Sequence, residues 1–109
     1  MPKLKMHIVI RWDLSAESSV IAAAHAGLGT YLTFQEDPLM QEWQKTSFIK
    51  IIHRPLNKIQ WDYCRKLGDH RVFTESKLDN LEVSVGFNIV KNPSILFSDI
   101  PLWTQNPQG

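Results

Sequence analysis

The chain has 109 residues, of which 43% are apolar and 21% are charged, and its formal net charge is +1. This length suits one domain and is too short for two, and the apolar content excludes a disordered chain. The small net charge gives no global argument for nucleic-acid binding, although a local basic face stays open.

The first part of the chain predicts a strand followed by a long helix. Residues 6–12 are rich in β-branched side chains and apolar on both faces, which is typical of a central strand covered on both sides. Ser15 is a suitable N-cap for a helix over residues 18–34. Gly27 and Gly29 lie inside this helix, where each costs about 1 kcal/mol relative to alanine. The simplest compensation is close approach of the helix to a neighbouring element.

The middle of the chain predicts a helix, a strand and a further helix. The helix spans residues 37–45, because a proline near its start suits the first turn. The strand spans residues 47–53, in which Lys50 is the single lysine among mostly apolar side chains. Asn57 caps the third helix and Gly68 ends it. Its buried face is expected to carry three residues at helical spacing: Ile59, Tyr63 and Leu67.

Two more strands complete the predicted sheet. A short strand spans residues 71–74, and residues 81–90 alternate between apolar and more polar side chains. The apolar series predicts one buried face: Leu81, Val83, Val85, Phe87 and Ile89. The order β-α-α-β-α-β-β predicts a single α/β domain, a mixed four-stranded sheet with helices on both faces. Its first two strands are expected to be parallel, and its last two antiparallel.

The domain is expected over residues 1–92, followed by a tail over residues 93–109. The tail has three prolines and no clear period, yet it is too apolar for a free linker. We expect it to dock either on the body or on a second subunit, so a homodimer is possible. Its apolar residues are Ile95, Leu96, Phe97, Ile100, Leu102 and Trp103.

The sequence also indicates where the protein is located and whether it holds a cofactor. No apolar run approaches the roughly 20 residues of a membrane span, and the start of the chain does not resemble a signal peptide. We therefore expect a cytoplasmic protein without membrane contact. Cys64 is the single cysteine, and its helical setting favours a half-buried, inert thiol. The four histidines lack ligand spacing, so neither a metal nor another cofactor is expected.

Several segments, in this order, resemble the type-2 peptidyl-tRNA hydrolase superfamily. They are the strand Ile8-Val9-Ile10-Arg11-Trp12-Asp13-Leu14, the helical Ala24-His25-Ala26 and the strand Phe48-Ile49-Lys50-Ile51-Ile52. Asp69-His70, Glu75 and the alternating residues 81–90 resemble a divergent branch of that superfamily. The resemblance covers roughly residues 4–91 and implies hydrolysis of the ester between a peptide and tRNA.

The sequence departs from the typical family pattern at three places. Glu17-Ser18 stands where the family has Gly-Lys, and Ala22 stands near the position of a family glutamine. Glu75-Ser76 stands where the family has Asp-Ala-Gly. These departures favour a second hypothesis, a non-catalytic descendant that binds RNA or a protein partner. A third hypothesis is a small interaction domain whose tail mediates dimerisation.

Ester hydrolysis requires a group that activates water, a donor for the developing oxyanion and cations for the RNA backbone. The catalytic candidates that the resemblance implies are Asp13, His25, Lys50 and Glu75. The candidates for substrate binding are Arg11, Ser18, His70, Thr74 and Ser76. A tRNA partner would contact a basic stretch with interleaved aromatic residues: His53, Arg54, Lys58, Trp61, Tyr63, Arg65, Lys66 and Arg71.

Each catalytic candidate also has an ordinary structural interpretation. Asp13 is placed to cap a helix or to pair with Arg11, and His25 to pack within its helix. Lys50 is placed to extend towards the edge of a sheet. Glu75 is placed to pair with a nearby cation. The basic stretch is equally typical of a solvated helix face, in which Lys58 pairs with Asp62.

Overall fold

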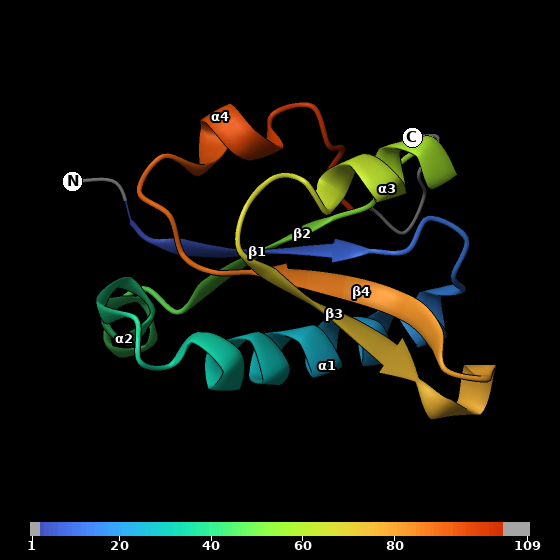
Figure 1. Ribbon diagram of the computed structural model, residues 1–109, viewed down its shortest axis with the longest axis horizontal. Coiled ribbons are helices and arrows are strands. Elements are labelled where there is room, and N and C mark those ends of the chain that lie inside the picture. Colours follow the sequence, from blue (N-terminus) through green and yellow to red (C-terminus); the bar gives the residue numbers. More distant parts are fainter. Residues whose placement is uncertain (1–2, 104–109) are drawn as a thin grey trace.

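The computed structural model describes residues 3–103, apart from the side chains of Ser94 and Ile95. Its elements are β1 (Lys5–Ile10), α1 (Ala16–Phe34), α2 (Pro38–Lys45), β2 (Ile49–His53), α3 (Lys58–Cys64), β3 (His70–Glu75), a 3-10 turn η1 (Ser76–Leu78), β4 (Leu81–Phe87) and α4 (Pro93–Phe97). The four strands form one mixed sheet in the order β2-β1-β4-β3 (Figure 1). The predicted fold class and element order are confirmed.

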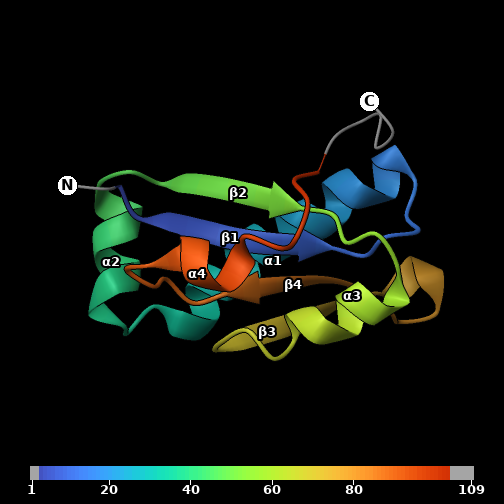
Figure 2. The same cartoon turned by 90° about the horizontal axis from the view of Figure 1, so that it is seen from above.

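The sheet separates two helical layers. β1 and β2 are parallel, and β4 lies antiparallel between β1 and β3. Helices α1 and α2 lie on one face of the sheet, and α3 and α4 lie on the other (Figure 1). Figure 2 shows α3 and α4 lying above the strands. α1 contacts β1, β4 and β3, whereas β2 lies at the edge beyond it.

Each face of the sheet has its own apolar core. The first core lies on the side of α1 and α2 and contains Met6, Ile8, Ile10, Leu14, Ala22, Ala26, Met40, Trp43, Phe73, Val83 and Ile89. The second core lies under α3 and α4 and contains Val9, Trp61, Cys64, Leu67, Val85, Phe87, Phe97 and Ile100. Alternate residues of β1 enter different cores, as expected for a central strand.

The prediction of one buried face on β4 is wrong, because the strand pairing shifts within it. Phe73 pairs with Ser84 and the next residue of β3 pairs with Glu82, so Val83 is an extra residue on β4. Val83 therefore joins the first core and Val85 joins the second. Ser84 also lies in the interior and donates its hydroxyl hydrogen to the Ala22 carbonyl, at 2.9 Å.

The predicted helix caps are present. Ser15 accepts a hydrogen bond from the Ser18 amide, and Asn57 accepts one from the Gln60 amide. Asp37, which was not predicted as a cap, also caps α2 by accepting a hydrogen bond from the Leu39 amide. The third helix nevertheless ends at Cys64, before Gly68, and it buries a different face from the predicted one. Ile59 is 81% exposed, whereas Trp61 and Cys64 are buried. Of the three residues predicted on the buried face, only Leu67 lies in the second core, together with Trp61 and Cys64, whereas Tyr63 is 47% exposed.

The described part of the tail docks on the body, as one of the two alternatives predicted. Phe97 and Ile100 are buried in the second core. Residues 101–103 lie along the end of β2, where the Arg54 amide donates to the Pro101 carbonyl and the Trp103 amide donates to the Ile52 carbonyl. Residues 104–109 of the predicted tail lie outside the described residues.

Candidate functional site

Two of the four predicted catalytic residues lie in direct contact. His25 projects from the middle of α1, and Glu75 is the last residue of β3. Nε2 of His25 lies 2.8 Å from Oε2 of Glu75. The other carboxylate oxygen of Glu75 accepts the backbone N–H of Lys77, at 3.1 Å. The side chain of Glu75 is only 16% exposed, and that of His25 is 43% exposed.

This contact determines which nitrogen of His25 is available. An ionised carboxylate only accepts hydrogen bonds, so Nε2 of His25 carries the hydrogen that it donates to Glu75. In the neutral imidazole, Nδ1 then has a free lone pair. The hydrogen bonds from His25 and from the Lys77 amide lower the pKa of Glu75, which keeps its carboxyl group ionised at neutral pH. An imidazole held in this way can accept a proton from water.

The surface is hollowed on both sides of the His25–Glu75 pair. A hollow of about 520 Å³ is lined by Ala24, His25, Leu28, Gly29, Leu32, Arg71, Phe73 and Thr74. A second hollow, of about 270 Å³, is lined by Glu17, Ser18, Ile21, Ala22, Glu75, Lys77, Leu78 and Val83. The predicted substrate residues Thr74 and Ser18 thus line one hollow each. Ser76 is exposed and follows Glu75 directly in η1.

Arg71 lines the same hollow as His25. The sequence placed it in the basic stretch and, with Lys77, among the cations that could pair with Glu75, but the ion pair of Glu75 is with His25. Its guanidinium donates to the Thr33 hydroxyl at 2.9 Å and lies 5.0 Å from the centre of the Phe73 ring. Arg71 and Phe73 are two residues apart in β3, so both side chains lie on the strand face that meets α1. This alternation was the signal in the sequence that could have placed Arg71 at the hollow.

The other predicted residues lie elsewhere. Asp13 follows the carboxyl end of β1, where its carboxylate binds Nε of Arg11 at 2.7 Å and is 48% exposed. This is the salt bridge that the sequence left open for Asp13. His70 lies at the opposite end of β3 from Glu75, and its Nδ1 donates to the Gly68 carbonyl at 2.8 Å.

Lys50 lies on the other side of α1 from His25. It pairs in register with Met6 near the start of β1 and lines a third hollow, between α1, α2 and β2. Its ammonium group donates to the Phe48 carbonyl at 3.2 Å. The predicted catalytic residues therefore occupy three separate places, and the structure joins only His25 and Glu75.

A pair of histidines, His7 and His53, lies in the interior, and the sequence did not predict their contact. Nδ1 of His7 is 2.7 Å from Nε2 of His53, and both rings stack on Phe97. Nδ1 of His53 donates to the Ile100 carbonyl at 3.1 Å, so in the neutral pair His7 donates to His53. His7 and His53 lie 46 residues apart in the sequence, and only the pairing of β1 with β2 brings them together.

Two further results concern metals and thiol chemistry. Among the described residues, no group of three or more His, Cys, Asp or Glu side chains is placed to hold a metal ion. Cys64 is buried, and burial raises the pKa of its thiol to about 11. The thiol is therefore protonated and unreactive at neutral pH.

Comparison of the chain with models of protein families gives no match, and comparison with curated proteins gives none either. Within residues 3–103, no helix combines the length and the apolar character that crossing a membrane requires.

Proposed function

We propose that the chain is a peptidyl-tRNA hydrolase-like esterase in which the His25–Glu75 pair activates water. The observation that carries the proposal is the 2.8 Å hydrogen bond between these side chains, which leaves Nδ1 of His25 as a proton acceptor. His25 lines one of the two hollows and Glu75 lines the other. The resemblance of residues 4–91 to the type-2 superfamily supplies the substrate class. A protein that acts on peptidyl-tRNA works beside the ribosome, which agrees with a cytoplasmic location.

The reaction follows from general acid–base chemistry. Nδ1 of His25 takes a proton from water while the water oxygen attacks the ester carbonyl. The tetrahedral intermediate collapses by breaking the bond between the acyl carbon and the ribose oxygen. The imidazolium then returns its proton to that oxygen, which leaves a free peptide acid and tRNA with an intact hydroxyl group. Glu75 stabilises the imidazolium between these two steps, as carboxylates do in other histidine-based hydrolases.

Substrate contacts are assigned to the side chains around the pair. Ser18 and Thr74 carry hydroxyl groups in the two hollows and are the candidates for donating to the oxyanion. Arg71 lines one hollow and Lys77 the other, and they are the candidates for contacting phosphates of the acceptor end.

The test is release of a labelled N-blocked aminoacyl group from tRNA. His25→Ala should lower kcat/KM by about 10²-fold or more, the usual contribution of a general base. Glu75→Gln should lower it less, because the glutamine keeps a hydrogen-bond acceptor for Nε2 but loses the charge. Asp62→Asn is the matched control, because Asp62 also accepts a side-chain hydrogen bond of 2.8 Å, from Lys58 of α3, away from both hollows.

The second candidate function is a non-catalytic descendant that binds RNA or a protein partner. The observation that favours it is the separation of Asp13 and Lys50 from the His25–Glu75 pair. This candidate expects no turnover by the wild-type protein, with tRNA binding that weakens steeply as salt is raised. If the wild-type protein neither hydrolyses nor binds tRNA, the esterase and the RNA-binding descendant both fail, and a protein-binding role, such as that of the small interaction domain, is left.

A further inference from the structure

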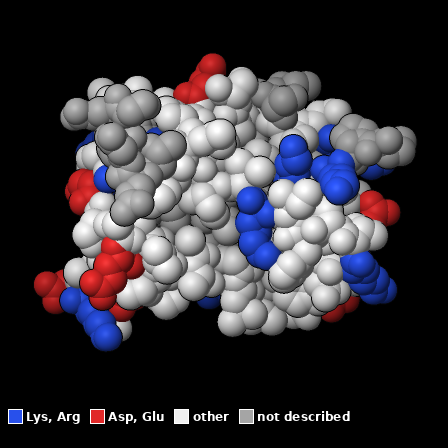
Figure 3. Space-filling model, turned by 180° about the vertical axis from the view of Figure 1, so that it is seen from behind, with Lys and Arg blue, Asp and Glu red and all other residues white. Residues whose placement is uncertain are grey.

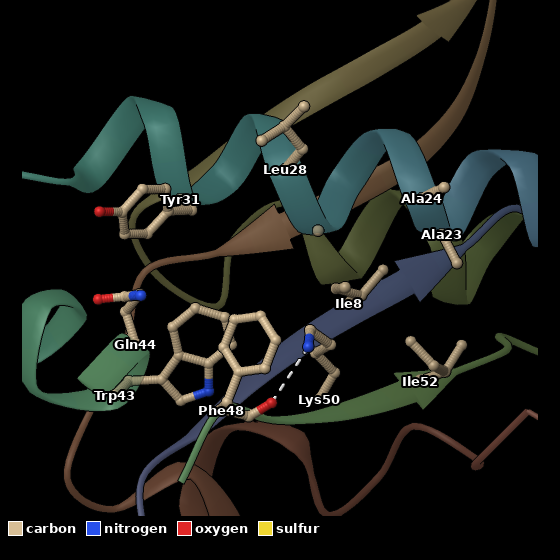
Figure 4. A pocket seen from close by; sticks show the side chains of 11 residues that line it. Ile8, Ala23, Ala24, Leu28, Tyr31, Trp43, Gln44, Phe48, Lys50 and Ile52 are labelled. Carbon is tan, nitrogen blue, oxygen red and sulfur yellow. Dashed lines mark hydrogen bonds between the residues drawn. The ribbon is translucent and has the colours of Figure 1, made fainter. Parts of the chain in front are cut away.

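A long apolar groove lies between α1, α2 and β2, on the side of α1 away from Glu75. Its main hollow has a volume of about 550 Å³, within the range of about 300–1,000 Å³ that is usual for small-molecule sites. Ala23, Ala24, Leu28 and Tyr31 line it from α1, and Ile8 and Ile52 line it from the sheet (Figure 4). Trp43, Gln44 and Phe48 close the end next to α2.

The groove continues along α1 beyond this hollow. A neighbouring hollow of about 200 Å³ is lined by Ile10, Ser19, Val20, Ala23, Ile52 and Trp103. Ala23 and Ile52 line both hollows, so the two form one elongated apolar surface. Figure 3 shows the face of the molecule that carries β2, which is largely uncharged apart from a Lys or Arg side chain near its centre and others towards the α2 end.

Gly27 keeps the groove open at a cost to the helix. The sequence predicts that both interior glycines of α1 allow close packing, and this holds for Gly29, where an added Cβ would meet the Phe73 ring at 2.1 Å. At Gly27 an added Cβ would meet nothing within 4 Å. Packing therefore does not require this glycine, although it destabilises the helix by about 1 kcal/mol relative to alanine. The missing side chain of Gly27 leaves free space in the wall of the groove.

Lys50 supplies the charge. Its ammonium group lies 3.2 Å from the centre of the Phe48 ring and is the one charged group among the described residues that line the main hollow. None of the ion pairs within residues 3–103 includes Lys50, and partial burial lowers the pKa of its ammonium group. An anion at this position would gain a partner without displacing a carboxylate.

Phe48 is held at the mouth of the groove by an unfavourable backbone conformation. Its φ angle is 55°, in the left-handed region that bulky residues rarely adopt, and its amide donates to the Trp43 carbonyl at 2.9 Å. The ring packs on Trp43 yet remains 53% exposed. Such strain costs about 1–3 kcal/mol and concentrates at binding sites.

We propose that this groove binds an apolar monocarboxylate, such as a medium-chain fatty acid, with its carboxylate on Lys50 and its chain along α1. The single cation beside an otherwise uncharged, elongated hollow matches one negative charge on an apolar body. A second copy of the chain fits less well. Antiparallel pairing of two β2 edges would bring the two Lys50 side chains close together, and like charges on neighbouring strands repel. The proposal is independent of the esterase function.

The test is binding of decanoate, below its micellar concentration, to the full chain by calorimetry, with decan-1-ol and decyltrimethylammonium as comparison ligands. Decanoate should bind the wild-type protein and shift the amide NMR signals of Gly27, Phe48 and Ile52. Lys50→Met should weaken decanoate binding by about tenfold or more, as loss of a charge-assisted hydrogen bond does, and should leave decan-1-ol binding nearly unchanged. Gly27→Leu should fill the hollow and abolish binding of both ligands.

Two controls separate these effects from general damage. Ala16→Leu places a leucine at an exposed position of α1 outside both hollows, and Lys58→Met removes an exposed lysine of α3. Both should bind decanoate like the wild-type protein, and thermal unfolding verifies that every variant folds. The proposal is overturned if decanoate does not bind, if all three ligands bind equally well, or if Gly27→Leu binds normally. It is also overturned if sedimentation shows a dimer that Phe48→Asp dissociates while decanoate fails to bind.

Discussion

Gly29 of α1 lies directly against the ring of Phe73 in β3, so that a methyl group at position 29 would lie 2.1 Å from Cε1 of the ring. Gly27, one half-turn earlier in the same helix, faces open space. The same substitution should therefore have opposite effects at the two positions. Gly29→Ala should destabilise the protein by about 1–3 kcal/mol through overpacking. Gly27→Ala should stabilise it by about 0.5–1 kcal/mol, because alanine loses less backbone entropy on folding.

Urea unfolding of both variants measures this difference directly. Phe73→Leu provides a further control. Because leucine is smaller than the phenylalanine ring, Gly29→Ala should cost less stability in this background than in the wild-type protein. An equal loss of stability for the two alanine variants would show that both glycines serve packing.

The buried histidine pair predicts how stability depends on pH. Burial, followed by the charges of His53 and Lys5, lowers the pKa of His7 from 6.5 to about 4, and burial also lowers the pKa of His53. Between these values the unfolded chain binds more protons than the folded chain. The free energy of unfolding should therefore be fully retained above about pH 6.5 and fall as the pH drops towards 4. The loss from His7 alone is about 3 kcal/mol.

Unfolding curves recorded from pH 7.5 to 5 test this behaviour above the range in which carboxylates titrate. His7→Phe keeps a ring that can stack on Phe97 and removes the titrating group, so the slope should become smaller. A wild-type protein equally stable at pH 7.5 and pH 5 would contradict the burial of a neutral pair.

Arg54 fixes the connection between β1 and α1. Its Nη2 donates to the carbonyls of Trp12 and Leu14, at 2.9 and 3.2 Å, and its Nε donates to Trp12 at 3.1 Å. A lysine cannot donate in this forked geometry. Arg54→Lys should therefore lower the free energy of unfolding by about 1–3 kcal/mol. Arg71 is exposed, and its guanidinium donates a hydrogen bond to one hydroxyl group. Arg71→Lys should therefore lower the free energy of unfolding much less than Arg54→Lys. An equal loss of stability for the two variants would contradict the role given to Arg54.

Cys64 should report on global unfolding. Its thiol lies in the second core and its pKa is raised to about 11, so both access and ionisation oppose its modification. A thiol reagent at neutral pH should react with the native protein at least about 10³-fold more slowly than with the urea-unfolded chain. Rapid labelling of the native protein would instead show local opening of α3.

The sequence predicted the sheet and its helices because the responsible signals are local. The caps Ser15 and Asn57 each bond to an amide three residues further on, and period-2 or helical patterns repeat within one element. It did not predict features that depend on pairing between distant strands. The extra residue Val83 on β4 changes which core each neighbour enters, and no composition rule marks it. Trp61, rather than Ile59, faces the sheet from α3, and the helical period alone does not say which of the two apolar positions packs there.

For the candidate site, the sequence likewise supplied the residues but not the contacts between them. The resemblance selected His25 and Glu75, which lie 50 residues apart, and their contact appears only when α1 packs against β3. Lys50 and His25 are both preceded and followed by uncharged residues, so the sequence treats them alike as isolated polar groups. Only the position of α1 between them assigns one to the groove and the other to the histidine–carboxylate pair.

The segment of residues 101–103 beside β2 also bears on aggregation. A bare edge strand presents a row of backbone donors and acceptors on which other chains can grow as added strands. Hydrogen bonds from Arg54 to Pro101 and from Trp103 to Ile52 occupy the end of that row, and Lys50 places a charge in the remainder. A chain shortened after Lys91 would lose this cover together with Phe97 and Ile100. It should therefore form insoluble assemblies rather than the stable monomer expected if the tail served only for dimerisation.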